Sequence, residues 1–222
     1  MPKTAIILGA TGLTGGLLTG LLMKDANYSK IKLFTRRPTG FSDPKIEEIQ
    51  CDVLDLEASK DNFTGDVIFC CIGTTKAKTP DRHLYHKIDY GIPMEAAQLA
   101  IENSIDTFLV ISSVGTSDKS TFFYVRTKGE MERDLLKIGI PHTYIMKPAF
   151  INGRPDEDRK GEKGLKLLMK ITDFFMMGPL KKYRSTHALQ IARAMAYLGI
   201  HPHKNANISN DQIKTLSQQY EP

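Results

Sequence analysis

The sequence predicts an α/β domain built on a doubly wound parallel sheet, and three observations carry this prediction. A short apolar, β-forming run at 5–8 leads directly into glycines and then into helically spaced leucines. Strand-like and helix-like segments alternate along the rest of the chain, without repeats or a long linker. The segment 65–73 is apolar almost throughout, which is typical of a strand covered by helices on both faces of the sheet.

Length and composition indicate one globular domain over residues 1–222, in which about 150–185 contribute a small substrate or lid region. The chain has 222 residues, of which 41% are hydrophobic and 25% are charged, as in ordinary soluble proteins. No apolar run is long enough to span a bilayer, and the chain opens on a predicted core strand. We therefore expect neither a transmembrane helix nor a cleavable signal.

The cysteines indicate the cellular compartment that we expect, and the net charge bears on the binding partners. Cys51, Cys70 and Cys71 lie in or beside apolar segments, without the spacing of a disulfide framework or a metal site. They are typical of small buried hydrophobes in a reducing compartment, so we predict a cytoplasmic protein without a metal. The net charge is +5, but the basic residues are scattered and no aromatic ladder accompanies them, so we expect no nucleic-acid partner.

The opening turn predicts a binding site for a dinucleotide. Gly9, Gly12 and Gly15 separate the first strand from the first helix. A glycine-rich turn of this kind leaves backbone N–H groups at the positive end of the helix dipole, where a pyrophosphate can bind. Thr11 and Leu13 complete the predicted binding turn. An ordinary strand–helix turn without a ligand is the alternative.

A second strand, at 30–35, ends in two arginines that predict which cofactor binds. In a dinucleotide-binding fold this strand end meets the adenosine ribose, and an acidic residue there would bind the 2′-hydroxyl of NAD. This chain has Arg36 and Arg37 at that place, and no acidic residue between Asp25 and Asp43. Arginine binds a 2′-phosphate through charge-assisted hydrogen bonds, so we predict NADP(H) in preference to NAD(H). Two solvated loop arginines are the alternative.

The remaining strands and helices follow in alternation. The end of the buried strand at 65–73 brings Gly73, Thr74 and Thr75 to the side of the sheet that would face the cofactor. The other predicted strands are 45–51, 107–112, 143–147 and 206–209. The other predicted helices are 84–101, 122–138, 163–177 and 187–198, with one more at the end of the chain.

A tyrosine and a lysine four residues apart predict a catalytic site. Tyr124 and Lys128 share one face of the helix predicted at 122–138, so their polar ends can meet. A tyrosine hydroxyl has a pKa of about 10, so it exchanges its proton poorly at neutral pH. A nearby ammonium stabilises the phenolate and lowers this pKa, which makes proton transfer to a carbonyl oxygen feasible. Ser112 and Ser113 lie at the end of the preceding strand, where a hydroxyl can hydrogen-bond the same oxygen. A surface pair on a helix is the alternative.

These motifs together resemble the atypical short-chain dehydrogenase/reductases, in the NAD(P)-binding group that includes the mammalian Tat-interacting-protein-like oxidoreductases. The three-residue step from Gly9 to Gly12 is similar to the extended and atypical branches of that superfamily. The resemblance covers almost the full length of the chain. The segments that carry it are Gly9-Ala-Thr-Gly12-Leu-Thr-Gly15, Thr35-Arg36-Arg37-Pro38, Cys70-Cys71-Ile-Gly73-Thr-Thr, Ile111-Ser112-Ser113-Val-Gly115, Tyr124-x-x-x-Lys128 and Lys147-Pro148-Ala-Phe-Ile-Asn-Gly153-Arg154.

The resemblance implies a Rossmann-type fold and a catalytic set. Ser113, or in second place Ser112, would join Tyr124 and Lys128 in that set. Lys128 would also hold the nicotinamide ribose, and Pro148 would lie against the nicotinamide.

The resemblance also implies an adenine contact and one departure from the family pattern. Asp52, followed by Val53, would contact the adenine, with a helix cap as the alternative for Asp52. Members commonly have Arg-Pro-Gly where this chain has Lys147-Pro148-Ala149, which leaves the turn after the strand plausible.

The leading hypothesis is an NADP(H)-dependent oxidoreductase that transfers a hydride to or from a small carbonyl or alcohol. Tyr124 would protonate the carbonyl oxygen, Lys128 would tune Tyr124, and Ser113 would polarise the carbonyl. An NADP(H)-binding regulatory or interaction protein with little or no catalysis is the alternative. A small molecule is the expected partner, and a homodimer is left open.

The part after 152 would select the substrate. Arg154, Arg159 and Arg184 could meet an anionic group, with solvated arginines as the alternative. The predicted helix at 163–177 is amphipathic and basic, so we expect a lid or core-packing helix. Docking on an anionic membrane surface is its less favoured alternative.

Overall fold

Seven parallel strands form one sheet, which confirms the predicted doubly wound fold. The computed structural model describes residues 1–153 and 184–221. The order across the sheet is β3-β2-β1-β4-β5-β6-β9, and every neighbouring pair is parallel. The strands are β1 (Lys3–Leu8), β2 (Tyr28–Thr35), β3 (Ile46–Gln50), β4 (Val67–Cys70), β5 (Thr107–Ile111), β6 (His142–Lys147) and β9 (Asn207–Ser209).

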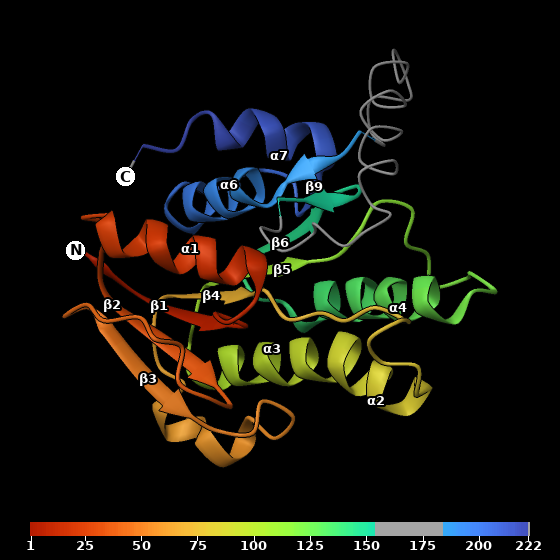
Figure 1. The fold of residues 1–222 in the computed structure, drawn as a ribbon, viewed down its shortest axis with the longest axis horizontal. Coiled ribbons are helices and arrows are strands. Elements are labelled where there is room, and N and C mark those ends of the chain that lie inside the picture. The colour runs from red at the N-terminus through yellow and green to blue at the C-terminus, as the bar shows by residue number, and fades with distance from the viewer. Residues whose placement is uncertain (154–183, 222) are drawn as a thin grey trace, which may run out of the picture.

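Helices cover both faces of this sheet (Figure 1). On one face lie α1 (Leu13–Lys24), α6 (Ala188–Ile200) and α7 (Asn210–Ser217). On the other lie α2 (Arg82–His86), η2 (Lys87–Gly91), α3 (Ile92–Glu102) and α4 (Phe123–Ile138), with the short 3₁₀ helix η1 (Glu57–Asn62) near the β3 edge. Each helical layer seals its own apolar core against the sheet, and this explains why β1, β4 and β5 are apolar on both faces. None of the helices in the described ranges is both long and apolar enough to cross a membrane.

The helix predicted at 84–101 is instead three segments joined end to end, with the π-helical turn η2 between α2 and α3. Pro93 stands four residues after Asp89 and has no N–H to donate to the Asp89 carbonyl. A wider turn accommodates the proline, and such π turns are frequent at functional sites. The consequence is that Asp89 lies in a locally widened part of the helix.

A second, two-stranded sheet was not predicted. It pairs β7 (Ile151–Asn152) with β8 (Thr186–His187). Asn210, at the start of α7, accepts a hydrogen bond from the Ala149 backbone N–H at 3.0 Å, and its amide donates to the Arg184 carbonyl at 2.8 Å. The chain on either side of the intervening segment is therefore fixed to the main sheet. The helix predicted at 163–177, with Arg154 and Arg159, lies outside the described residues.

Candidate active site

In the turn after β1, neighbouring backbone lies so close to the glycines that no side chain would fit there. Gly9 has φ +90°, and a Cβ added to it would lie 3.0 Å from the Ile72 side chain and 3.1 Å from the Cys71 backbone. A Cβ on Gly15 would lie 2.2 Å from the Gly9 carbonyl oxygen, so only glycine lets α1 pack on this turn. Gly12 precedes α1 and offers no side-chain cap to its first N–H groups. The start of α1 therefore presents backbone donors to an anion.

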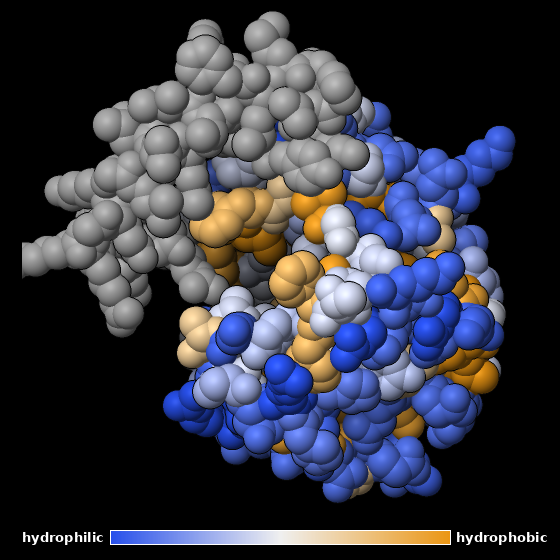
Figure 2. Space-filling model, turned by 90° about the vertical axis from the view of Figure 1, so that its right-hand side faces the viewer, coloured by the Kyte–Doolittle hydropathy of each residue, from blue (hydrophilic) through white to orange (hydrophobic). Residues whose placement is uncertain are grey.

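A cavity of about 410 Å³ opens next to this turn, at the carboxyl ends of the strands. This is the expected place for a ligand in an open α/β sheet. Figure 2 looks at this side of the molecule, where hydrophobic side chains gather around a hollow in a mainly hydrophilic surface. Seven residues predicted to bind the cofactor line the cavity: Gly9, Thr11, Gly12, Arg36, Val53, Gly73 and Thr74.

Ten further residues of the cavity wall were missed by the sequence reasoning. Several are apolar and come from the helix that follows β4, which the glycine motif does not point to. A buried apolar residue near a strand end carries no signal that separates a ligand wall from the core. The ten are Phe34, Thr35, Leu54, Cys71, Ile72, Lys78, Thr79, Leu84, Ile88 and Ile92.

Seven other predicted cofactor residues do not line the cavity, and two of them, Asp52 and Arg37, make local contacts instead. The Asp52 carboxylate accepts a hydrogen bond from the Leu54 backbone N–H at 3.0 Å, which is a turn contact. Arg37 is exposed and its carbonyl accepts from the Thr35 hydroxyl at 2.8 Å, so Arg36 alone of the two arginines reaches the cavity wall. Leu13, Gly15, Thr75, Lys128 and Pro148 also lie outside the wall.

Lys128 nevertheless reaches the edge of the cavity. A Cβ added to Gly73 would lie 3.8 Å from the Lys128 ammonium and 3.2 Å from Asp89 Oδ1. The ammonium donates to Asp89 Oδ1 at 3.0 Å, and the Thr74 backbone N–H donates to the same oxygen at 3.3 Å. A fully buried carboxylate therefore joins the predicted catalytic lysine to the loop after β4.

Tyr124 lies one turn before Lys128 on α4, in an aromatic group. Its ring meets the Tyr85 ring edge-on at 4.6 Å and the Phe123 ring at 5.5 Å. The Lys76 ammonium stands 5.7 Å from the centre of the Tyr124 ring. Since Lys76 belongs to the loop after β4, Tyr124 is held between that loop and α2.

The two serines after β5 differ in their surroundings. Ser112 is buried, and its hydroxyl donates to Glu132 of α4. The Thr116 hydroxyl donates to the same carboxylate at 2.7 Å, and Lys147 pairs with its other oxygen at 2.8 Å. Ser113 is only half-buried. Of the two serines, Ser113 is therefore the one whose hydroxyl is not already bonded to Glu132.

Pro148 directly follows β6, and Arg184 lies just before β8. Pro148 is buried, and its carbonyl accepts a hydrogen bond from the Val114 backbone N–H at 2.9 Å, which ties the loop after β6 to the loop after β5. Arg184 is half-buried where the described chain resumes.

The three cysteines are free. Cys70 is the last residue of β4, and Cys71 follows it directly. Burial raises the pKa of the Cys70 thiol to about 12, and burial also raises the pKa of Cys71. Both side chains are therefore neutral thiols at physiological pH.

Comparison with known proteins identifies what this fold and cavity are similar to. A family model described as NAD(P)H-binding matches residues 9–171. The mitochondrial protein FMP52 of Candida albicans is 33% identical over 167 residues, which cover 73% of this chain and 71% of that relative. FMP52 of Meyerozyma guilliermondii is 28% identical over 98% of this chain and 96% of its own length.

Solved structures are similar in fold at low sequence identity. A short-chain dehydrogenase/reductase superfamily protein from Agrobacterium tumefaciens with bound NAD has a TM-score of 0.67 at 13% identity, over 92% of this chain and 76% of its own. The UDP-glucose 4-epimerase of Thermotoga maritima has a TM-score of 0.68 at 14% identity, over 99% of this chain and 84% of its own. Together with the family match, these findings confirm the resemblance to atypical short-chain dehydrogenase/reductases and a nicotinamide cofactor.

The predicted cytoplasmic location is wrong. The FMP52 relatives are named mitochondrial proteins. The prediction rested on cysteines without disulfide spacing, which are typical of any reducing compartment and do not separate the cytoplasm from the others.

Proposed function

This chain belongs to the NAD(P)H-binding family and has the fold of the short-chain dehydrogenase/reductases, and we propose that it is an NADP(H)-dependent oxidoreductase that interconverts a small carbonyl compound and its alcohol. The observation that carries the proposal is the position of Lys128. Its ammonium lies beside Gly73 at the edge of the cavity, and Tyr124 stands one helical turn away. This position supports the proposal that the pair suited to proton transfer acts beside a bound nicotinamide and its substrate.

The wall of the cavity fits a phosphorylated dinucleotide. The backbone around Thr11 and Gly12 would bind the pyrophosphate, and Arg36 would bind the 2′-phosphate. Val53 and Leu54 would form an apolar seat for the adenine. When bound, the reduced cofactor supplies the hydride for a carbonyl carbon, and the oxidised form accepts one from an alcohol.

The residues of the chain would then manage the proton. In the reducing direction the Tyr124 hydroxyl would give its proton to the carbonyl oxygen. The Lys128 ammonium would stabilise the phenolate that remains, and the Ser113 hydroxyl would hydrogen-bond the developing alkoxide. In the oxidising direction the phenolate would take the proton from the alcohol. The partner of this site would be a small molecule.

A mitochondrial location forms part of the proposal, and the names of the FMP52 relatives support it. Fractionation of cells that express the full chain with a small C-terminal tag would test it. Recovery in the cytosolic fraction alone would contradict it.

An NADP(H)-binding regulatory protein is the second candidate. One observation favours it: the Lys128 ammonium is already engaged by the Asp89 carboxylate at 3.0 Å. An ammonium with a carboxylate partner stabilises a phenolate less than a free one does.

The choice of cofactor is tested with the two arginines, which serve as a matched pair. NADPH and NADH are titrated against the wild type, Arg36→Ala and Arg37→Ala by cofactor fluorescence. Of the two arginines only Arg36 lines the cavity. Arg36→Ala should therefore weaken the binding of NADPH about tenfold and leave the binding of NADH unchanged, while Arg37→Ala should have little effect on either. Tighter binding of NADH than of NADPH by the wild type would overturn the proposed preference.

Catalysis is tested by single-turnover reduction of a panel of aldehydes, ketones and quinones. Tyr124→Phe keeps the aromatic packing and removes the proton donor, so the rate should fall at least about a hundredfold with cofactor affinity unchanged. Equal rates would rule out the role of Tyr124. Tight NADPH binding by the wild type without turnover of any carbonyl would favour the regulatory protein.

A further inference from the structure

Asp89 is a buried charge that the sequence motifs did not single out. Its side chain is 0% exposed, in the π-helical turn η2. A carboxylate away from water costs free energy unless charges and donors surround it, and an apolar side chain of similar size would often be as stable. The presence of this acid next to Gly73 therefore calls for a reason other than stability.

The groups around this carboxylate are the ones that the proposed reaction needs. Lys128 Nζ and the Thr74 backbone N–H both donate to Asp89 Oδ1. Burial, and next the Asp89 charge, raise the pKa of Tyr85 far above its usual value, so Tyr85 faces the carboxylate as a neutral hydroxyl. The Tyr85 ring in turn packs against Tyr124. Asp89 thus touches Lys128 directly and Tyr124 through Tyr85.

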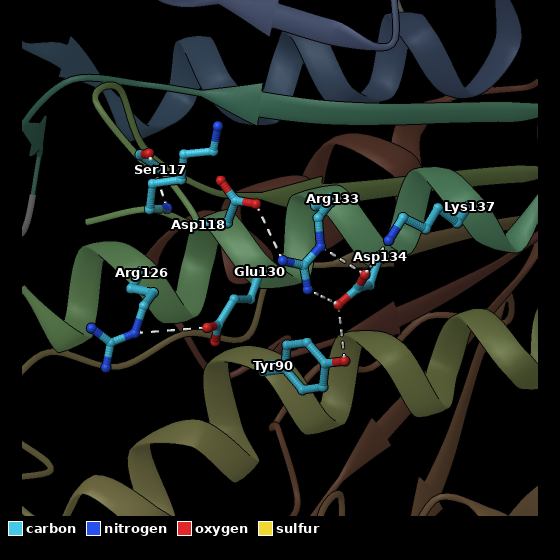
Figure 3. Close-up of polar contacts among 9 residues, drawn as sticks. Tyr90, Ser117, Asp118, Arg126, Glu130, Arg133, Asp134 and Lys137 are labelled. Atoms are coloured by element: carbon cyan, nitrogen blue, oxygen red, sulfur yellow. Dashed lines mark hydrogen bonds and ion pairs between the residues drawn. The ribbon is translucent and has the colours of Figure 1, made fainter. Parts of the chain in front are cut away.

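Joining η2 to α4 does not by itself require Asp89. The next residue of the same turn, Tyr90, donates from its hydroxyl to Asp134 of α4 at 3.3 Å on the outer side of the helix pair (Figure 3). One residue of the turn thus holds α4 from outside, and its neighbour holds Lys128 from inside. The inner contact differs in that it ends on a residue of the proposed catalytic set.

We propose that Asp89 is a positioning residue, which holds the Lys128 ammonium beside the cofactor-facing Gly73 and balances its charge. This inference rests on the proposed function. The carboxylate fixes the lysine in two ways. The hydrogen bond sets the place of the ammonium, and the bond from the Thr74 N–H ties that place to the loop after β4.

The first test replaces the carboxylate by its neutral isostere. In Asp89→Asn, kcat for carbonyl reduction should fall on the order of tenfold with KM almost unchanged, because a misplaced catalytic group costs rate more than substrate binding. The alkaline limb of the pH–rate profile should also move to lower pH by about one unit, since a neutral amide no longer opposes loss of protons from the site. The charged or titratable groups that face Asp89 are Lys128, Tyr85 and Cys70.

The matched control is Tyr90→Phe, which removes the outer tie of the same turn. It changes no charge near the cavity, so its pH–rate profile should coincide with that of the wild type. A wild-type profile and kcat in Asp89→Asn would overturn the proposal. A loss of rate in both variants with no shift in pH would also overturn it, because a merely structural tie would produce that result.

A double-mutant cycle keeps the test decisive if Asp89→Asn alone folds poorly. Lys128→Met and the double variant Asp89→Asn/Lys128→Met leave no unpaired ammonium beside Gly73, and their residual single-turnover rates can be compared directly. If Asp89 acts through Lys128, the two rates should be equal. A further loss in the double variant would contradict the proposal.

Cofactor titration separates this inference from the proposed function. Asp89→Asn should weaken NADPH several-fold, about as much as Lys128→Met does, because both remove the same ribose contact. If the wild type reduces no carbonyl but this loss of affinity is found, the reaction is wrong and the positioning role stands. If the wild type reduces carbonyls and Asp89→Asn matches it in rate, pH profile and affinity, the positioning role is wrong and the reaction stands.

Discussion

The two faces of α4 carry ion pairs of different character. On the inner face Lys128 and Glu132, one turn apart, pair with Asp89 and Lys147 at 3.0 and 2.8 Å, and the two carboxylates are at most 9% exposed. On the outer face the paired side chains are between 22 and 67% exposed (Figure 3). The outer pairs are Arg126–Glu130, Arg133–Asp118, Arg133–Asp134 and Lys137–Asp134.

The difference in exposure predicts that the inner and the outer ion pairs contribute differently to stability. An exposed pair gains little, because water and salt screen the charges and two side chains lose freedom. A buried pair is costly to form and more costly to break, since removing one partner leaves the other charge uncompensated. The inner face therefore fixes the loop after β4, which lines the cavity, and the loop after β5, while the outer face adds little to stability.

The largest effect is expected from breaking the second inner pair. Glu132→Ala leaves the Lys147 ammonium unpaired and takes the acceptor from the Ser112 and Thr116 hydroxyls. The free energy of unfolding in urea should fall by about 3 kcal/mol. Glu132→Gln keeps an acceptor for the hydroxyls and should cost less. A loss below about 1 kcal/mol for Glu132→Ala would place the inner pair with the surface pairs.

A smaller effect is expected where α4 meets the loop that carries Ser113. A Cβ on Gly129 would lie 2.3 Å from the Asp118 backbone N and from the Ser117 carbonyl carbon, so Gly129→Ala should push the loop away and cost about 2 kcal/mol. Gly20→Ala on α1 is the matched control, because nothing lies within 4 Å of its Cβ. It should raise stability by up to about 1 kcal/mol in the same urea melts.

The sequence alone predicted most of the sheet and the glycine turn. Alternating apolar runs and glycines are local signals, and they predicted β1, α1 and β2 correctly and pointed to Arg36, which lines the cavity. The spacing of Tyr124 and Lys128 likewise needs only one helix. What a single element encodes can be read along the chain.

The partners of α4 could not be read in this way. Asp89 and Lys128 are 39 residues apart, and Lys147 pairs with Glu132 across an intervening loop. No local pattern distinguishes an acid that will be buried from one that will be solvated. An acid four residues before Pro93, in a segment that reads as one helix, is the signal that could have pointed to Asp89.

The loss of stability at alkaline pH tests the surroundings of Tyr85, which faces Asp89 on the inner side of α4. Burial and the Asp89 charge raise its pKa in the folded state, whereas in the unfolded chain it ionises near about pH 10. Its contribution is complete below that pH and is lost above it, by about 1.4 kcal/mol per pH unit. Thermal melts between pH 9 and 11 should therefore fall less steeply for Tyr85→Phe than for the wild type. Parallel curves would mean that burial and the Asp89 charge do not raise the pKa of Tyr85 in the folded state.

The smallest effect is expected on the outer face. Arg133 bridges Asp118 and Asp134 at 3.2 and 2.7 Å, and its hydrogen bond lowers the pKa of Asp134. A lowered carboxyl pKa adds stability above the pKa of the unfolded chain, and this stability is lost as the pH falls through acid values. Because Arg133 is 45% exposed, Arg133→Ala should still lower the stability only slightly at pH 7, and even less in 1 M salt. A loss as large as that of Glu132→Ala, or one that salt does not reduce, would mean that the outer network is part of the framework that holds the cavity.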